Sequence, residues 1–575
     1  MAEPLSINQF ETGIGDSPHL GFGVMRNVNI DASPGAITVS GAATSLFHTA
    51  YSATFTGATS DICTAAAGSV PASRTAVKPT TTGTLPAGLT ANTVYFIINL
   101  SDTTFKLATT ITLADAGTAV DITDTGSGTH TITTVNPGTI NHIIKDPRTD
   151  DHFFQDSNGR VWYGNSSGNG GKLKLLKNAT LDNAVVGSAA LTNAAGNGIV
   201  LFKQNDSGST HWLLAFRNAL IDIIDVYSDA DKETPSWTNG WDFGGTASDS
   251  TLNSGAGSGN RHHAIVGQDD IVYFTDGRYI GTIKEASGST FAPGTSSTYT
   301  GNDQALDTPT NEVLVHLEEL GTKILAAGSR SNNIYPWDRI SDSFDLPIKV
   351  PEFNVQRLKN VGNLVYVLAG KTGIIYSTQG TYVKEVKKLP ENVVGDTLTT
   401  SVTWGGVDAY KGGLLFGASG GTSANRGMYL LYPDGRLVIE NQPSSGAGNV
   451  TAINADSGLP YIGYASGADY TSTTKYSSLN AVVNSMWYRV ATKTEKGTYS
   501  KLEVVTAKSA TSGAQIRVGY RENISASFTT LTTYTADSST IVFGPTDIGL
   551  TNIENIQAQV EFDDDVELVE VRLIP

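Results

Sequence analysis

A recurring pattern over residues 141–480 constrains the fold of this chain more than any other feature. In each copy a short apolar strand is followed by a turn of Gly, Asp or Asn, and then by a second strand that carries an aromatic residue. Clear copies contain the segments Asp156–Tyr163, Ile271–Ile280, Gly373–Tyr382 and Met428–Ile439. Self-similarity at a regular period is the sequence signature of a repeat architecture.

The spacing of the copies predicts a β-propeller. Four short strands with their turns need roughly 40–50 residues, which is the size of one propeller blade. We expect six or seven blades over residues 138–481, with loop insertions at Gly168–Asn197 and Gly244–Asn260. A row of stacked sandwiches has the same density of strands and is the alternative. The repeat units, which are spaced by about 44 to 64 residues, begin near Asn141, Gly198, His262, Asn311, Val355, Val402 and Val450.

Composition and length place the repeats in an all-β chain of several domains. The chain has 575 residues, 61 of them Gly, and only 16% are charged. Runs with a helical period are scarce, and Asn178–Ala195 is the one tolerable helix candidate. A single hydrophobic core stops growing at roughly 250–300 residues, so more than one domain is expected.

Three further units are expected around the propeller. Residues 1–50 form a β segment that packs on the propeller, with a hairpin between Val28–Ile30 and Ala36–Val39. Residues 51–137 are rich in Thr, Ala and Gly, lack Trp, and predict a small inserted β-sandwich that hangs on two linkers and is dispensable. Residues 482–575 contain at least six alternating segments and predict a C-terminal jelly-roll-like sandwich.

Charge and apolar content argue against several classes of function. The formal net charge is −17, and no basic patch suited to a nucleic-acid surface is visible. An acidic lumen through which DNA slides without sticking remains compatible with this charge. No run approaches the roughly 18 apolar residues of a membrane span, and Met1–Ser6 lacks the features of a secretory signal. The single cysteine, Cys63, excludes an intrachain disulfide and is expected to be a small apolar core residue.

Few residues qualify as candidates for a metal or catalytic site. Asp563–Asp565 is the one acidic triplet, for which a solvated turn is favoured over metal binding or catalysis. His262 and His263 are adjacent, so in a strand they point to opposite faces and do not share a metal. His152 and His211 could in principle approach a propeller axis. We therefore assign no catalytic, cofactor-binding or metal-ligating residue, and we expect no enzymatic activity.

Sugar-cleaving propellers are the main enzymatic alternative. Sialidase-type blades carry a Ser-x-Asp-x-Gly-x-Thr-Trp turn, and the segment Gln155–Trp162 lacks both the Asp and the Thr of that pattern. Arg160, Arg278 and Arg436 occupy the same turn position in their repeats. That recurrence indicates repeat geometry rather than a catalytic arginine triad.

Residues 88–132 carry a resemblance to a known group of proteins. The segments Gly88–Asn99, Thr104–Leu107, Gly117–Ile122 and Gly126–Ile132 resemble a small β-domain recurrent in structural proteins of tailed bacteriophages. Asn27–Asp31 followed by Pro34 and Gly35 is also similar to the openings of phage tail and head–tail proteins. The whole layout resembles phage tail nozzle or hub proteins that carry a β-propeller, and this resemblance implies a virion component without assigning functional residues.

The resulting hypothesis is a non-enzymatic tail nozzle, hub or adaptor protein in a tailed-phage virion, made in the host cytoplasm. The resemblance implies a homo-oligomeric ring, with six copies expected, that contacts adaptor or portal and tail fibre proteins while DNA passes through the lumen. A strand lent to a neighbour, from Ala36–Val39 or Glu567–Leu573, could join the copies. The alternative is a glycan-binding or glycan-cleaving propeller with a lectin-like C-terminal domain, which a cluster of Trp, Asp and Glu at one mouth of the propeller would favour.

Overall fold

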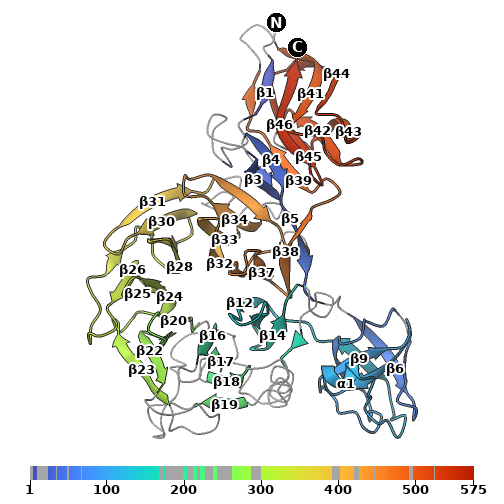
Figure 1. Ribbon diagram of the computed structural model, residues 1–575, viewed down its shortest axis with the longest axis vertical. Coiled ribbons are helices and arrows are strands. Elements are labelled where there is room, and N and C mark those ends of the chain that lie inside the picture. The colour runs from blue at the N-terminus through green and yellow to red at the C-terminus, as the bar shows by residue number, and fades with distance from the viewer. Residues whose placement is uncertain are drawn as a thin grey trace.

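The computed structural model shows a propeller from which two smaller β units project (Figure 1). It describes residues 4–8, 14, 24–33, 35–47, 51–66, 68–166, 174–176, 198–203, 211–216, 221–226, 237–241, 262–285, 299–390, 402–419, 426–445, 448–490, 496–523 and 525–575. The helix expected at Asn178–Ala195 and the insertion at Gly244–Asn260 lie outside these residues.

The described strands build seven blades of four antiparallel strands each, so the prediction of a propeller is confirmed. Six blades are separate sheets, and blade 6 is part of a ten-stranded sheet. Blades 1 and 2 are β12 (Ile140–Lys145), β13 (His152–Asp156), β14 (Val161–Gly164) and β15 (Lys174–Leu175), and β16 (Gly198–Lys203), β17 (His211–Phe216), β18 (Ile221–Asp225) and β19 (Trp237–Trp241). Blades 3 and 4 are β20 (Ala264–Val266), β21 (Val272–Asp276), β22 (Tyr279–Glu285) and β23 (Tyr299–Asp307), and β24 (Leu314–Leu320), β25 (Lys323–Gly328), β26 (Asn333–Trp337) and β27 (Ile348–Lys349).

The last three blades complete the ring. Blades 5 and 6 are β28 (Val355–Val361), β29 (Leu364–Ala369), β30 (Ile374–Thr378) and β31 (Val383–Lys388), and β32 (Thr403–Tyr410), β33 (Gly413–Ser419), β34 (Gly427–Leu431) and β35 (Leu437–Asn441). Blade 7 takes β36 (Ala452–Asn454), β37 (Tyr461–Tyr464) and β38 (Gly467–Lys475) from the end of the repeats, and its outermost strand is β5 (Gly41–Ser45). An N-terminal strand therefore closes the last blade, and β36 packs on β12 to close the ring.

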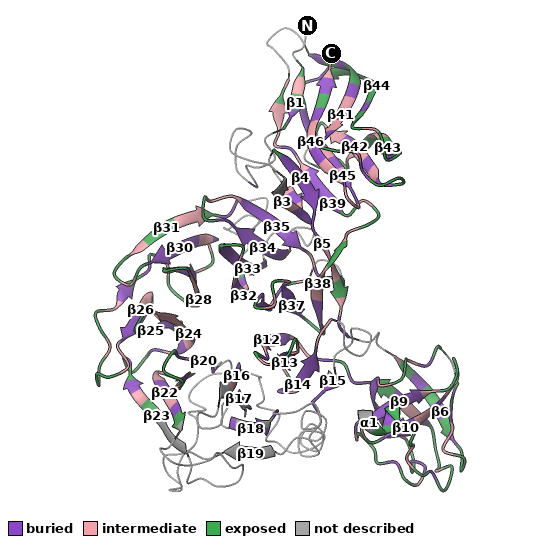
Figure 2. Ribbon diagram, viewed as in Figure 1, coloured by how far each residue is buried: buried purple, intermediate pink, exposed green. Residues whose placement is uncertain are grey.

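Apolar strand faces hold neighbouring blades together. The described residues in the second and third strands of most blades are largely buried, as the purple strands of Figure 2 show. Most of the apolar cores are shared between adjacent blades; for example, Leu325 of blade 4 and Val365 of blade 5 lie in one cluster. Radial packing thus buries both faces of sheets that could not bury them alone.

The C-terminal unit is a two-sheet sandwich that includes N-terminal strands. One sheet has the order β3-β4-β46-β41-β44 with β1 paired to β46, and the other contains β39, β45, β42 and β43 with β40 at its side. The bounds are β1 (Leu5–Ile7), β3 (Val28–Ser33), β4 (Ala36–Val39), β39 (Ala481–Asn484), β40 (Tyr488–Arg489), β41 (Gly497–Thr506), β42 (Gln515–Arg521), β43 (Thr529–Thr535), β44 (Val542–Ile553), β45 (Asn555–Phe562) and β46 (Glu567–Ile574).

Two expectations for the N-terminal segment need correction. Residues 1–50 do not simply pack on the propeller, because β1, β3 and β4 belong to the C-terminal sandwich. β2 (Val24–Arg26) lies between β35 of blade 6 and β39, and so joins propeller and sandwich in one continuous sheet. The strands proposed for exchange between copies, Ala36–Val39 and Glu567–Leu573, pair with each other within the chain. Neither offers an open edge.

The inserted unit is a closed six-stranded barrel rather than the small sandwich expected for residues 51–137. The strand order is β10-β7-β6-β11-β8-β9, and closure removes the open edges that two short sheets would leave. Its core contains Phe55, Phe105, Ile132 and the fully buried Cys63. The bounds are β6 (Ser52–Gly57), β7 (Cys63–Ala65), β8 (Ala76–Thr81), β9 (Tyr95–Asn99), β10 (Thr104–Ala108), α1 (Ile111–Asp115) and β11 (His130–Thr134).

The barrel contacts the propeller through a shared apolar cluster. This cluster contains Ala76 and Phe96 of the barrel and Trp162 and Leu175 of blade 1. Phe47, which leads from β5 into the barrel, packs edge-on against Trp162 with 5.1 Å between ring centroids. The barrel is therefore seated on blade 1 as well as linked to it.

Candidate axial site

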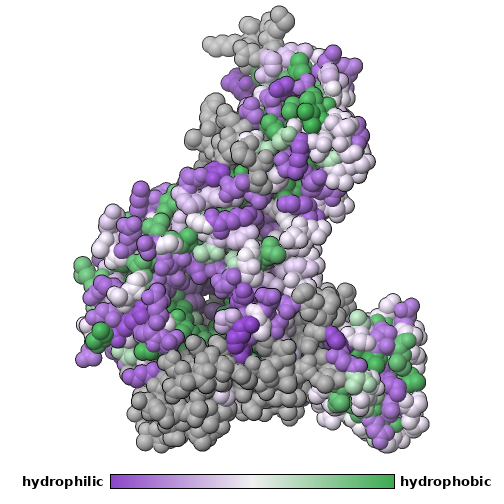
Figure 3. Space-filling model, in the orientation of Figure 1, coloured by the Kyte–Doolittle hydropathy of each residue, from purple (hydrophilic) through white to green (hydrophobic). Residues whose placement is uncertain are grey.

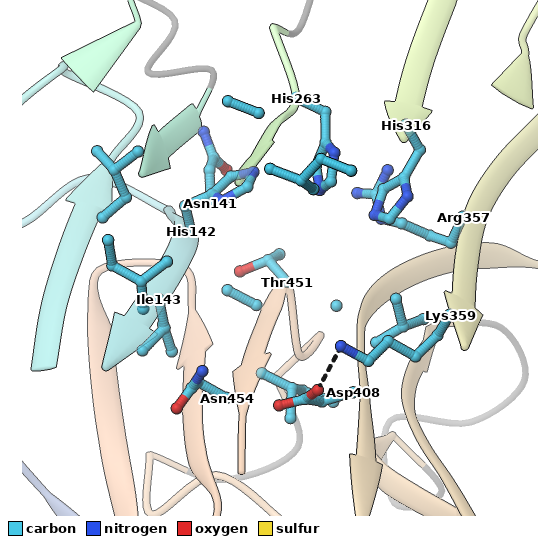
Figure 4. Close-up of a pocket in the computed structure, with 18 of the residues that line it drawn as sticks. Asn141, His142, Ile143, His263, His316, Arg357, Lys359, Asp408, Thr451 and Asn454 are labelled. Atoms are coloured by element: carbon cyan, nitrogen blue, oxygen red, sulfur yellow. Dashed lines mark ion pairs between the residues drawn. The ribbon is translucent and has the colours of Figure 1, made fainter. Parts of the chain in front are cut away.

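The innermost strands of all seven blades surround a cavity of about 240 Å³ on the propeller axis (Figure 4). Hydrophilic residues cover much of the propeller face around its centre in Figure 3. The polar residues that line the cavity are Asn141, His142, His263, His316, Glu318, Arg357, Lys359, Asp408, Thr451, Asn454 and Asp456.

The register of the innermost strands sorts these residues into two layers. His316 and Glu318 lie two residues apart on β24, and Arg357 and Lys359 two residues apart on β28. Side chains at i and i+2 share one face of a strand and are roughly 6–7 Å apart along it. The layer with His316 and Arg357, which also contains His142 and His263, is here called the donor layer. The layer with Glu318, Lys359 and Asp408 is called the charged layer.

A β-bulge recurs just before the donor layer. The strand register shifts between Ile140 and His142, between Leu314 and His316, and between Val355 and Arg357. Bulges re-aim side chains and are frequent at functional sites. The same local irregularity therefore turns one polar side chain per blade toward the axis in blades 1, 4 and 5.

The three histidines lie close together in the donor layer. The His263 and His316 rings are stacked with centroids 3.7 Å apart, and His142 lies 5.4 Å from His263. His263 Nδ1 accepts the backbone N–H of Leu317 at 3.1 Å, and His316 Nδ1 accepts that of Leu358 at 3.4 Å. An imidazole whose Nδ1 is an acceptor carries its hydrogen on Nε2. Burial lowers the pKa of both imidazoles well below 6.5, with nearby cations adding to the effect, so both are neutral at pH 7.

The charged layer contains a compensated ion network. Lys359 Nζ lies 2.8 Å from Asp408 Oδ1. Burial alone would lower the pKa of Lys359, but the carboxylates of Glu318 and Asp408 raise it above its usual range. Burial raises the pKa of Glu318 to about 7, against the opposing effect of Lys359. Lys359 is therefore a fixed cation, and Glu318 exchanges its proton near neutral pH.

Several lining side chains also tie one blade to the next. Arg357 Nε donates to the Gly405 carbonyl at 2.9 Å, and Asp408 Oδ2 accepts the backbone N–H of Ala455 at 2.6 Å. The Thr451 hydroxyl donates to the Ile140 carbonyl and so joins blade 7 to blade 1. The cavity wall is held in place by these bonds between blades, which makes it a preformed site.

The histidines named from the sequence lie in different environments. His262 is buried within its blade, where Nδ1 lies 2.7 Å from the Thr275 carbonyl, whereas His263 lines the axial cavity. The two side chains thus separate as expected for adjacent strand positions. His152 does not reach the axis but stacks on Tyr461 at 3.8 Å. The side chain of His211 lies outside the described residues.

Sequence reasoning missed His142 and His316 as axial residues. Both, like Arg357, stand at the third residue of the innermost strand of their blade. Aligning the repeat units and comparing this one position would have identified them.

The acidic triplet has a structural role in the sandwich. Asp563 is buried and accepts the backbone N–H groups of Gln515 at 2.6 Å and Leu479 at 3.0 Å. Asp565 accepts the backbone N–H of Thr511 at 2.7 Å. The triplet is therefore neither a fully solvated turn nor a convergent metal site. No group of three or more His, Cys, Asp or Glu among the described residues is placed to hold a metal ion.

The three repeated arginines contact different groups, and Cys63 lies in the core of the barrel. Arg160 donates to the Asn136 carbonyl, Arg278 pairs with Asp307, and Arg436 pairs with Asp434 and with Asp31. The partners differ from one repeat to the next, and Asp31, one partner of Arg436, belongs to β3 of the sandwich. Burial raises the pKa of Cys63 to about 12, so this thiol is an inert core residue.

A second hollow lies between the outer parts of blades 5 and 6. It has a volume of about 520 Å³, and Tyr382 at its edge is 72% exposed. Its walls combine aromatic and apolar side chains with polar ones, namely Leu364, Tyr366, Ser377, Thr378, Gln379, Lys384, Glu385, Val386, Pro433 and Asp434. We call it the Tyr382 groove. By contrast, Trp162, Trp212, Trp337 and Trp404 are buried.

Comparison with known proteins finds similar solved structures but no matching family. No family model matches the sequence, and no curated protein matches it. The computationally designed Ika8 protein aligns with 58% of this chain and 96% of its own at 11% identity and a TM-score of 0.36. The β-propeller domain of Cps50 (Swd1) from Myceliophteria thermophila aligns with 59% of this chain and 99% of its own at 11% identity and a TM-score of 0.38. The WD40 repeats of RRP9 align with 58% of this chain and 94% of their own at 9% identity and a TM-score of 0.38.

No helix among the described residues is long and apolar enough to span a bilayer.

Proposed function

We propose that this chain is a non-enzymatic structural component of a tailed-phage virion, a tail nozzle, hub or adaptor protein whose copies form a ring around the DNA channel. One observation carries the proposal. The residues that resemble a β-domain of phage structural proteins supply β9, β10 and β11 of the barrel, a closed unit that stands outside the propeller (Figure 1). A projecting module with its own core is suited to contacts with neighbouring proteins.

The rigid connection between propeller and sandwich supports the same proposal. β2 joins blade 6 to the sandwich, and β5 completes blade 7, so the N-terminal segment fixes the two units together. The barrel and the sandwich project from different parts of the propeller (Figure 1). Such a body can present several faces to a ring and its attachments without changing shape.

Contacts between copies are expected at exposed apolar side chains. Copies that each carry −17 repel one another, so association needs apolar surface rather than summed charge. Ile340 and Leu346 of the β26–β27 connection are each 89% exposed, and Tyr382 of blade 5 is 72% exposed. We therefore expect these exposed side chains, rather than exchanged strands, to form the contacts between copies.

Co-assembly tests the proposal. The purified chain is mixed with the tail proteins encoded beside it, and the particle mass is measured by light scattering. We expect a discrete oligomer, with six copies of this chain, and its loss in an Ile340→Asp/Leu346→Asp variant. A Lys323→Ala variant, on the exposed side of the same blade, is the control because its ion pair with Asp345 is exposed and weak. A chain that stays monomeric with every tail protein would contradict the proposal.

A glycan-binding propeller is the second candidate, and the Tyr382 groove favours it. An exposed tyrosine ring flanked by Gln379, Glu385 and Asp434 offers an apolar platform beside polar groups, the combination that a ligand with hydroxyls and apolar faces needs. Binding of host polysaccharide by the isolated chain, weakened about tenfold or more by Tyr382→Ala, would favour this function. Unchanged binding in that variant would exclude the groove.

A further inference from the structure

The donor layer of the axial cavity has the features of an anion site. His263 and His316 each use Nδ1 to accept a backbone N–H, so each presents Nε2–H as a donor. Neither Nε2 atom has a hydrogen-bond partner among the described residues, although both side chains line the cavity. Figure 4 shows His142, His263, His316 and Arg357 in an arc along one side of the cavity.

The permanent charges that act most strongly on this layer are positive. Arg357 and Lys359 both disfavour a protonated imidazole at His263 and at His316. Glu318 lies in the charged layer, two residues beyond His316 on β24, and Asp408 is held there by Lys359. Asp456, the third carboxylate of the lining, also acts on Lys359. An anion in the donor layer would therefore meet N–H groups and cationic charge before it met a carboxylate.

The size of the cavity limits the ligand. About 240 Å³ is below the usual 300–1,000 Å³ of sites for drug-sized ligands, yet ample for an ion of a few heavy atoms. The bonds between blades around the cavity keep the donors fixed, which lowers the cost of binding.

From this geometry we propose that the donor layer binds one small oxyanion, a phosphate, a sulfate or a carboxylate, through the Nε2–H groups of His263 and His316. Arg357, whose Nε and Nη1 donate to the Gly405 and Gln356 carbonyls, supplies positive charge beside the ion. The proposal is independent of the virion function, because a propeller in a ring and a propeller alone would both retain the site. An ion bound on the propeller axis would contact residues of blades 3, 4 and 5 and so link these blades.

Calorimetric titration of the full-length chain tests the proposal. Sodium phosphate, sodium sulfate and sodium acetate are titrated separately at constant ionic strength in a buffer without oxyanions. We expect saturable binding at one site per chain for at least one of these salts. Stronger binding of phosphate or sulfate would identify a tetrahedral ion, and stronger binding of acetate would identify a carboxylate; either result supports the site.

Matched variants distinguish a loss of anion binding from a loss of folding stability. Asn places a side-chain oxygen near the position of His Nδ1 and lacks Nε2, so His263→Asn/His316→Asn keeps the acceptors for Leu317 and Leu358 and removes both donors. We expect a melting temperature close to that of the wild type and affinity weakened at least about tenfold, since each hydrogen bond to a charged group contributes about that factor or more. His130→Asn, in the barrel, is the control and should bind as the wild type does.

Two results would overturn the proposal. One is the absence of saturable binding of all three anions up to about 10 mM by the wild-type chain. The other is equal affinity in the wild type and in a folded double variant, which would place the ion elsewhere. If the double variant does not fold, the same comparison is made with His316→Asn alone.

Discussion

At the scale of residues, three buried ionisable groups of this protein are held by backbone hydrogen bonds. His263 and His316 accept backbone N–H groups across blade junctions, and Asp563 accepts two in the sandwich. A buried polar group without such partners would cost free energy, whereas each of these fixes one element against another. The polar residues of the axis thus stabilise the ring as well as line its cavity.

His152 makes stability depend on pH. Burial lowers the pKa of His152 from 6.5 to about 4 in the folded chain. The unfolded chain therefore takes up the proton first, and the free energy of unfolding falls by up to ~3 kcal/mol as the pH drops through this window. His152→Phe keeps a ring against Tyr461 and removes the titration. Urea melts at pH 7 and pH 4.5 should show a smaller loss for the variant, by about 2–3 kcal/mol. Equal losses in both proteins would contradict this assignment.

At the scale of elements, the sequence predicted the repeats well and their closure poorly. Each expected unit start falls within three residues of an innermost strand, from Asn141 beside β12 to Val450 beside β36. The alternation of apolar strands and Gly turns is local, so it can be read along the chain. The pairing of β5 with β38 joins residues more than 400 positions apart, and no local pattern encodes it.

The same limit applies to the barrel and the site. The Thr-, Ala- and Gly-rich composition of residues 51–137 predicted a β unit, but barrel closure depends on the pairing of β7 with β10, which composition does not specify. The axial histidines come from separate blades, and the ring alone brings them together. His263 could be noticed in the sequence because it adjoins His262. Its stacking on His316, which lies 53 positions away, could not be predicted from the sequence.

The close packing of blades 6 and 7 requires a glycine at position 405. A Cβ atom on Gly405 would lie 1.8 Å from the Val450 carbonyl oxygen, which belongs to the neighbouring backbone. We expect Gly405→Ala to lower the free energy of unfolding by about 1–3 kcal/mol, because the blades must separate. Gly448→Ala is the control, since its nearest neighbour would be Tyr464 Cβ at 4.0 Å. Denaturant melts measure both, and an undisturbed Gly405→Ala protein would show that the junction is looser than described.

At the scale of the whole molecule, N-terminal strands complete both of the larger units. β5 closes the propeller, β1, β3 and β4 build the sandwich, and β2 bridges the two. The barrel between β5 and β12 is different, because its strands pair only with each other among the described residues. Propeller and sandwich should therefore unfold together, while the barrel is a separate unit.

Removal of the barrel tests this division. Residues 51–135 are replaced by a short Gly/Ser linker, which keeps Phe47 and its contact with Trp162. We expect soluble protein with one cooperative thermal transition in circular dichroism, at a somewhat lower temperature because part of the shared apolar cluster becomes exposed. Loss of soluble expression, or a broad non-cooperative transition, would show that the barrel is integral to the propeller.

Electron microscopy of the assembled protein tests the proposed function most directly. The chain is imaged alone and after mixing with the tail proteins encoded beside it. The virion proposal predicts a closed ring of identical copies around a lumen, with a propeller, a barrel and a sandwich resolved in each copy. Isolated propellers in every mixture, together with binding of host polysaccharide at the Tyr382 groove, would contradict it.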